Sequence, residues 1–442
     1  TEGRQLEADK EDAKHLFEGL KVFENDKYKE YQGKYPVVYM TFKNAKQTTW
    51  EGTYAKLKKL IAEEYRRHSY LLDKNIMDES QVLKYENIMK LKEEDYTDCI
   101  QNLTIYLTQY YREKCIVLID EYDTPIQSGY LDEYYDKVIE FTKSIFQAGL
   151  KNNTNLKQGV ITGVMKVAQE SVFSDFNNPI ISTILSAQYT ESFGFTVGEV
   201  ESMAKYYNLE DKIEDIRDWY DGYIYGIDTP IYNPWSIINY ISCPENGFKP
   251  YWVNTSNNRI IKEVIQLDKK EGKEVIEKLL KGEEVRKVIE ENIVYQNIKS
   301  HPNVAWSFLL HAGYLKACDK GYDEFGESFE YSLKIPNREV TKIYRNMLKE
   351  WFEDEVKAAD KVLAIVDALK KNNIEKIGIL IEELYFRMVS YNDINTKDYD
   401  EEEKRHENFH HGFMLGLMMY AEGIFEINSN REYGLGRPDI VL

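Results

Sequence analysis

The chain has 442 residues, of which 43% are hydrophobic and 13% aromatic, and its 57 Lys and Arg against 76 Asp and Glu give a net charge of −19. The length excludes a disulfide-stapled miniprotein, the composition excludes an aromatic-poor disordered chain, and the negative field disfavours constitutive wrapping of nucleic acid. Four cysteines without C-x-x-C spacing and the lack of an apolar run of about eighteen residues predict a cytoplasmic protein with no membrane partner.

Strands and helices alternate in the first part of the chain. Residues 36–42 (PVVYMTF) form a β-branched and aromatic run, and a further strand is predicted at 159–162. Between them, residues 115–119 (CIVLI) are continuously apolar, which predicts a strand covered on both faces. Helical apolar spacing occupies the intervening segments at 50–61, 99–110 and 130–150. The alternation predicts an α/β fold with a parallel, doubly wound sheet.

Helical patterns dominate beyond about residue 195. A helix at 305–310, followed by strands at 314–317 and 329–335 around a charged turn, predicts a winged-helix-like module. Residues 340–384 are again helical in pattern. In the tail, a helix, a strand at 423–427, a turn at 428–436 and a strand from 439 are predicted.

The buried strand at 115–119 ends in the acidic string Asp120-Glu121-Tyr122-Asp123. In a P-loop NTPase, an Asp at the carboxyl end of such a strand holds magnesium and a following Glu orients the attacking water. A strand delivers its last side chains to the edge where ligands bind in open α/β sheets. The alternative is an ordinary core strand that ends in a solvated acidic turn.

A longer set of distinctive strings runs through the chain. It begins at VLIDEYDTPI (117–126) and continues through ITGVMKVAQESVFSDFNNP (161–179), FGFT and EVESM (193–203), WYDGY (219–223), YNPWSIINY (232–240), YWVNTS (251–256) and IPNREV (335–340). In this order, the strings resemble one family, the AAA-ATPase-like proteins that carry a C-terminal PD-(D/E)xK nuclease-like domain. The aromatic residues Trp219, Tyr220, Tyr223, Tyr232 and Trp235 are expected to pack in a core or lid rather than to act in a site.

The resemblance implies three domains: a P-loop NTPase-like parallel sheet at 1–240, a helical and winged-helix-like lid at 241–358, and a truncated restriction-endonuclease-like α/β domain at 359–442. It implies that Asp120 is the magnesium-side carboxylate and cofactor-binding residue, that Glu121 is the catalytic Glu, and that residues 159–163 form the sensor strand. The expected cofactors are Mg2+ and ATP.

The phosphate-binding string G-x-x-x-x-G-K-[ST] does not occur in these 442 residues. The Gly-Lys pairs at Gly33 and Gly272 have neither the preceding glycine nor the following Ser or Thr of the motif. We therefore expect a fragment whose phosphate-binding loop lies upstream of Thr1, and we expect the fragment itself to have no measurable ATP affinity.

The C-terminal part contains His406-Glu407-Asn408-Phe409-His410, which matches H-E-x-x-H formally and could place two imidazoles on one helix face for zinc. The extended form of the motif fails because Phe413 stands where its Gly would be. A zinc metallopeptidase is therefore the weakest of the functional alternatives.

A second interpretation of this part resembles the start of a PD-(D/E)xK core. There a helix Glu, a strand Asp and a later Glu-x-Lys converge on a divalent cation that activates water. Glu407 and Asp439 fit the first two positions as catalytic and metal-binding residues, and the Glu-x-Lys strand is expected beyond Leu442. Without the resemblance, Glu407 would be a helix-surface carboxylate and Asp439 a turn residue.

The sequence thus predicts a nucleotide-dependent switch protein with an ATPase module and a nuclease module, with a nucleotide as partner and DNA or RNA as candidate substrate. The main rival is a scaffold or binding protein that senses a nucleotide and cuts nothing. The sequence leaves the oligomeric state open.

Overall fold

The computed structural model describes residues 13–92, 95–151, 153–165, 179–226, 228–252, 271–291, 302–323, 328–346, 359–388, 428–429 and 440–441. Contacts divide the chain into two units. The first comprises residues 1–181 with 290–300, and the second comprises 182–289 with 301–442. Residues 182–240 group with the second unit, whereas the predicted first domain extends to residue 240. The domain assignment stays a prediction.

The first unit consists of a parallel sheet with helices around it. Its elements are η1 (Ala13–Leu16), η2 (Lys21–Glu24), α2 (Asp26–Lys29), β1 (Val37–Thr41), α3 (Trp50–Arg67), η3 (Ser69–Lys74), α4 (Glu79–Met89), α5 (Cys99–Tyr111), β2 (Cys115–Asp120), α6 (Thr124–Leu131), α7 (Tyr135–Leu150) and β3 (Leu156–Ile161). The helix predicted at 130–150 is divided between α6 and α7. Glu133 has a left-handed φ of 65°, which a continuous helix does not allow.

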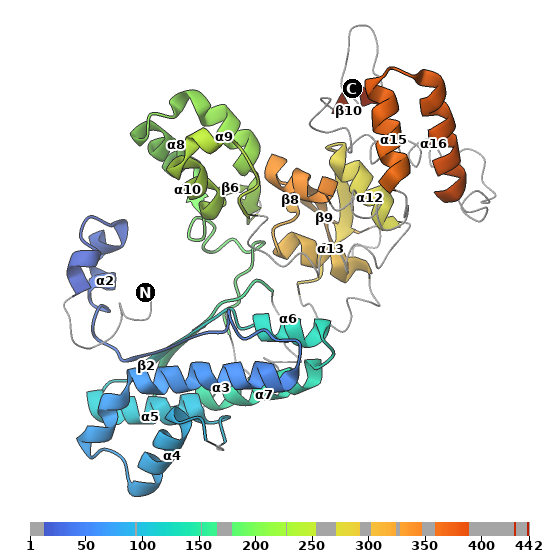
Figure 1. Ribbon diagram of the computed structural model, residues 1–442. Coiled ribbons are helices and arrows are strands. Elements are labelled where there is room, and N and C mark those ends of the chain that lie inside the picture. Colours follow the sequence, from blue (N-terminus) through green and yellow to red (C-terminus); the bar gives the residue numbers. More distant parts are fainter. Residues whose placement is uncertain are drawn as a thin grey trace. The chain divides into compact units, whose positions relative to one another are not determined.

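Strands β1, β2 and β3 pair in parallel and in that order, which confirms the predicted parallel sheet. Cys115, Val117 and Ile119 of the central strand are fully or almost fully buried. Helices α3, α5 and α7 lie on the same side of the sheet (Figure 1). A doubly wound sheet has helices on both faces, and the described residues show these helices on one face, so the doubly wound arrangement stays a prediction.

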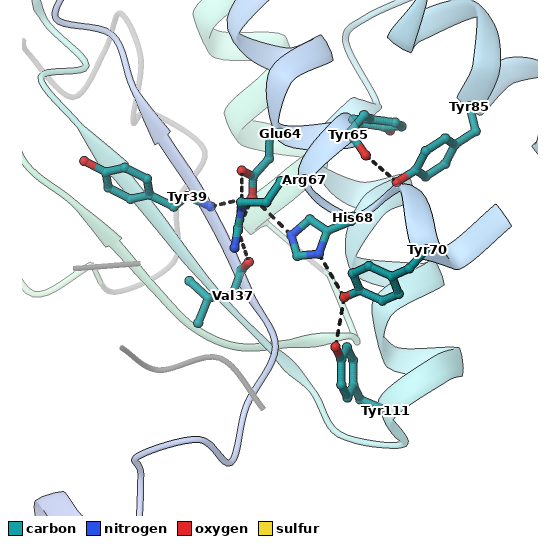
Figure 2. A network of polar contacts seen from close by, with 9 residues as sticks. All are labelled: Val37, Tyr39, Glu64, Tyr65, Arg67, His68, Tyr70, Tyr85 and Tyr111. Atoms are coloured by element: carbon teal, nitrogen blue, oxygen red, sulfur yellow. Dashed lines mark hydrogen bonds and ion pairs between the residues drawn. The ribbon is translucent and has the colours of Figure 1, made fainter. Parts of the chain in front are cut away.

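The outer edge of β1 is covered by two charged side chains of α3 (Figure 2). Because Pro36 and Phe42 bond to β2, the intervening Val37 and Tyr39 present backbone groups to the other side. Glu64 accepts from the N–H of Tyr39 at 2.8 Å, and Arg67 donates to the carbonyl of Val37 at 2.6 Å. Arg67 also holds Glu64 through Nε and Nη2, at 2.9 and 2.6 Å. Both edge groups are therefore satisfied by side chains.

The second unit begins with a small antiparallel sheet among helices. Its elements are β4 (Phe195–Thr196), α8 (Val197–Tyr206), η5 (Glu210–Lys212), α9 (Ile213–Tyr220), β5 (Tyr223–Tyr225), β6 (Thr229–Tyr232), α10 (Pro234–Ser242), η6 (Pro244–Asn246), α12 (Glu271–Leu280), β7 (Val285–Val288), α13 (Pro302–His311), β8 (Lys316–Tyr322), β9 (Phe329–Lys334), α15 (Ala359–Lys370), α16 (Ile374–Met388), β10 (Asn428–Ser429) and β11 (Ile440–Val441). Strands β4 to β6 lie in a segment expected to be mainly helical, since strands of two to four residues are too short to show alternation.

Residues of the string IPNREV (335–340) form hydrogen bonds with the aromatic strings of the second unit. Asn337 donates to the carbonyl of Asp221 at 2.9 Å, and the buried carboxylate of Glu339 accepts from Ser236 Oγ and from the N–H of Trp252, both at 2.7 Å. Gly222 has a φ of 104°, and a Cβ there would lie 2.1 Å from the carbonyl oxygen of Pro336. Only glycine permits this approach.

The aromatic residues of these strings divide between core and surface. Tyr220 and Tyr232 are buried in a hydrophobic cluster with Ile216 and Tyr240, as the sequence predicts. Trp235 instead has 52% of its surface exposed. The strings are thus mainly a packing and hydrogen-bonding framework.

The helix and hairpin predicted after residue 300 are present as α13, β8 and β9. Strand β7 adds to the hairpin, so the antiparallel sheet has the order β7-β9-β8. Residues 304–310 of α13 are all buried, so this stretch leaves little helix surface for a groove of nucleic acid. The winged-helix assignment stays a prediction. None of the helices in the described part is long and apolar enough to cross a membrane.

Candidate functional site

Three oxygen-bearing side chains lie in one row at the carboxyl edge of the parallel sheet. Asp120 is the last residue of β2, and Thr41, the last residue of β1, is its partner in register. Ile119 pairs with Ile161 of β3, which brings Thr162 to the level of Asp120 on the other side. Residues in register on parallel strands face the same side of a sheet, so the row is dictated by the pairing.

Both threonine hydroxyls donate to the carboxylate of Asp120. Thr162 Oγ1 lies 2.6 Å from Oδ1, and Thr41 Oγ1 lies 3.2 Å from Oδ2. The backbone is fixed as well, since the N–H of Phe42 donates to the carbonyl of Asp120 at 2.8 Å. Asp120 is half-buried and Thr162 is exposed. The carboxylate is therefore held in one orientation at an edge that solvent can reach.

Glu121 stands where the chain leaves the strand. Its φ of 51° lies in the left-handed region, which costs a residue other than glycine roughly 1 kcal/mol. Its Oε2 accepts from Thr124 Oγ1 at 3.1 Å, and Thr124 is the first residue of α6. The sharp turn places two carboxylates of consecutive residues at the same sheet edge.

The next two residues reach across to the turn after β3. Tyr122 donates its hydroxyl to the carbonyl of Met165 at 2.8 Å. Asp123 accepts from the N–H of Met165 at 2.8 Å and from that of Val164 at 3.3 Å. Burial of Asp123, which is 4% exposed, raises its pKa to about 6 against these hydrogen bonds. The acidic string and the residues after β3 are thus joined by side chains.

Residues 5–173 match the family model described as predicted AAA-ATPase. The matched segment contains all three parallel strands and the row of Thr41, Asp120 and Thr162. It does not reach residues 359–442, where the nuclease-like domain is predicted. No curated protein and no solved structure matches the chain.

The side chains of the segment similar to predicted AAA-ATPases fit a hard divalent cation. The row offers one carboxylate and two hydroxyls, and oxygen ligands of this kind suit magnesium, which usually takes one or two carboxylates and keeps several waters. A carboxylate has about four lone-pair sites, so the two hydroxyl bonds leave Asp120 able to bind an ion. No cluster of three or more His, Cys, Asp or Glu that could hold a metal occurs within the described ranges. The edge therefore suits an ion that completes its shell with water and phosphate.

Of the four predicted site residues, the structure describes two. Asp120 and Glu121 lie together at the predicted sheet edge. Glu407 and Asp439 lie outside the described residues, as do His406 and His410 of the zinc alternative. The roles of all four stay predictions.

Sequence reasoning did not single out Thr41, Thr162 or the contacts of Asp123. The two threonines stand at or next to the ends of strands that were predicted, so the signal was present. What was missing is the register, because Asp120 is 79 residues from Thr41 and 42 from Thr162 along the chain.

Proposed function

We propose that the first unit is the catalytic part of a nucleotide-dependent switch protein that hydrolyses ATP with Mg2+. The observation that carries the proposal is the carboxylate of Asp120, held by two hydroxyls at the carboxyl edge of the central parallel strand, inside the segment that matches the predicted AAA-ATPase model. Nucleotides bind at such edges in open α/β sheets.

Each residue of the row has a defined task in this proposal. Asp120 would hold the ion, directly or through water, while Thr41 and Thr162 keep its carboxylate from rotating. Glu121 would accept a hydrogen bond from the attacking water and align it, and Thr124 would hold the Glu121 carboxylate. A bound magnesium ion would supply the positive charge that stabilises the transferred phosphoryl group. The family resemblance implies that the whole protein also has a phosphate-binding loop, a string that these 442 residues do not contain.

The test is ATP hydrolysis by the protein extended to include that loop. We expect phosphate release to require Mg2+, and we expect Asp120→Asn to raise the half-saturating Mg2+ concentration at least tenfold. Glu140→Gln is the matched control, since it removes one negative charge from the exposed side of α7. If Asp120→Asn had the same Mg2+ dependence as the control, the proposed metal site would be wrong. ATP binding without hydrolysis by the unmutated protein would favour the sensor or scaffold instead.

A nuclease module in the last 84 residues is the second candidate. It is favoured by one described feature: β11 begins at Ile440, directly after Asp439, and pairs antiparallel with β10. A strand that directly follows Asp439 agrees with the PD-(D/E)xK interpretation. We propose that Glu407 and Asp439 bind a divalent cation for phosphodiester cleavage. Metal-dependent nicking of DNA that Asp439→Ala abolishes would support this, and unchanged nicking in that variant would exclude it.

A further inference from the structure

The turn after β3, residues 163–165, is held by hydrogen bonds to Tyr122 and Asp123. Tyr122 and Asp123 bind both backbone N–H groups of residues 164 and 165 and the carbonyl of Met165. Gly163 permits this approach, because a Cβ there would lie 2.5 Å from Asp123 Oδ1 and 2.8 Å from the ring of Tyr122. The turn therefore lies directly against the carboxylate and the phenol ring.

This turn begins at Gly163, directly after Thr162. Of the two hydroxyl groups that donate to Asp120, that of Thr162 is the closer. Backbone bonds fix Thr162 itself, since its N–H donates to Ile119 and its carbonyl accepts from Tyr122. Its hydroxyl is on an exposed residue, and the direction in which the chain leaves it is set by residues 163–165. A chain of contacts through the turn and Thr162 thus links Asp123 to Asp120.

We propose that Asp123 is a positioning residue for the metal site: it locks the 163–165 turn so that the Thr162 hydroxyl holds Asp120 in the orientation that receives magnesium. The proposal rests on the proposed ATPase function and deepens it. Tyr122 has the same task with one hydrogen bond instead of two.

A purely structural role explains Asp123 less well. The carboxylate is almost fully buried, and burial dominates over its two hydrogen bonds in raising its pKa. The ionised carboxylate at neutral pH therefore stabilises the fold less than the protonated group does at low pH. A costly buried charge next to a ligand site is typical of functional residues.

The experiment measures the Mg2+ dependence of ATP hydrolysis in the extended protein. Asp123→Asn keeps the shape but turns an amide N–H2 toward a backbone N–H, so one of the two hydrogen bonds is lost. We expect the half-saturating Mg2+ concentration to rise about tenfold, while the KM for ATP at saturating Mg2+ stays within twofold. Tyr122→Phe, which removes one hydroxyl, should raise it two- to threefold. Glu140→Gln should not change it.

A double variant separates positioning from mere loss of folding. If Asp123 acts through Thr162, the effects of the two substitutions should not add. The double variant Asp123→Asn with Thr162→Val should then have the same half-saturating Mg2+ concentration as the single variant in which this concentration is higher. Additive shifts would overturn the proposal, as would a lower kcat for Asp123→Asn with an unchanged Mg2+ requirement, because that result indicates fewer folded molecules. If Asp120→Asn has no effect, the proposed function fails and this inference fails with it. If Asp120→Asn is impaired and both Asp123→Asn and Tyr122→Phe behave as the unmutated protein, only the inference is wrong.

Discussion

Asp123 is more easily protonated than an exposed aspartate although two backbone N–H groups bind it. Desolvation is the largest cause, and the neighbouring charge of Glu121 adds to it. The folded-state pKa is about 6 and the ordinary value is 3.8, so the folded protein binds this proton more tightly than the unfolded chain does. Between these two values, stability falls as pH rises.

This shift predicts a pH dependence that belongs to one residue. The free energy of unfolding of the unmutated protein minus that of Asp123→Asn should decrease by about 3 kcal/mol between pH 3.5 and pH 7, from a shift of about two pKa units at 1.36 kcal/mol each. Urea unfolding of both proteins across this range measures it. A difference that does not change with pH would contradict the buried environment described for Asp123.

At the scale of elements, the two outer strands of the parallel sheet differ. The outer edge of β1 is covered by Glu64 and Arg67, whereas residues 157–160 of β3 are exposed. Glu64 is 6% exposed, and burial raises its pKa against the hydrogen bond from Tyr39. The network continues from His68 to Tyr70 at 3.0 Å and from Tyr70 to Tyr111 at 2.9 Å (Figure 2). Helix α3 therefore both covers the sheet and closes one edge of it.

Removing one partner of the Glu64–Arg67 pair should strongly lower the free energy of unfolding. Arg67→Ala deprives the buried Glu64 carboxylate of its bidentate partner and the Val37 carbonyl of its donor, so we expect a loss of roughly 3 kcal/mol in the free energy of unfolding. Lys59→Ala is the control on the same helix, because the pair of Lys59 with Glu63 is exposed and should contribute less than about 1 kcal/mol. Equal losses for the two variants in guanidinium unfolding would show that Arg67 and Glu64 do not stabilise the outer edge of β1.

In the second unit, Glu339 has the corresponding role between α10 and Trp252. It is fully buried and accepts from Ser236 and from the N–H of Trp252. Glu339→Ala should cost roughly 3 kcal/mol, because it strands a hydroxyl and a backbone N–H and leaves a cavity. The adjacent Arg338→Ala, which removes an exposed ion pair with Asp218, should cost about 1 kcal/mol or less. Tryptophan fluorescence during denaturation measures both, and a reversed order would contradict this assignment.

The elements that were predictable from sequence are those with a strong local signal. A continuous apolar run gives β2, and helical spacing gives α3, α5 and most of α7. The partners of Asp120 and Asp123 were not predictable from sequence. Strand register and the hydrogen bonds of these two side chains join residues that are more than forty positions apart in the chain. The capping of the β1 edge by Glu64 was equally hidden, since a Glu in a charged helix usually indicates a solvated face.

At the scale of the whole molecule, the candidate site lies within the first of the two units. The 442 residues contain no G-x-x-x-x-G-K-[ST] string to supply the amides and the lysine that contact phosphates. We therefore expect calorimetric titration of this chain with ATP to give no measurable binding. Micromolar binding would show that phosphates are held by residues other than those the resemblance implies.

The central claim is that the Asp120-Glu121 edge hydrolyses ATP, and Glu121→Gln tests it most directly. In the protein extended to include the phosphate-binding loop, this variant keeps the size of the side chain and loses only the carboxylate that would align water. We expect ATP to bind with unchanged affinity while single-turnover hydrolysis slows at least a hundredfold. Hydrolysis by Glu121→Gln at the rate of the unmutated protein would contradict the account.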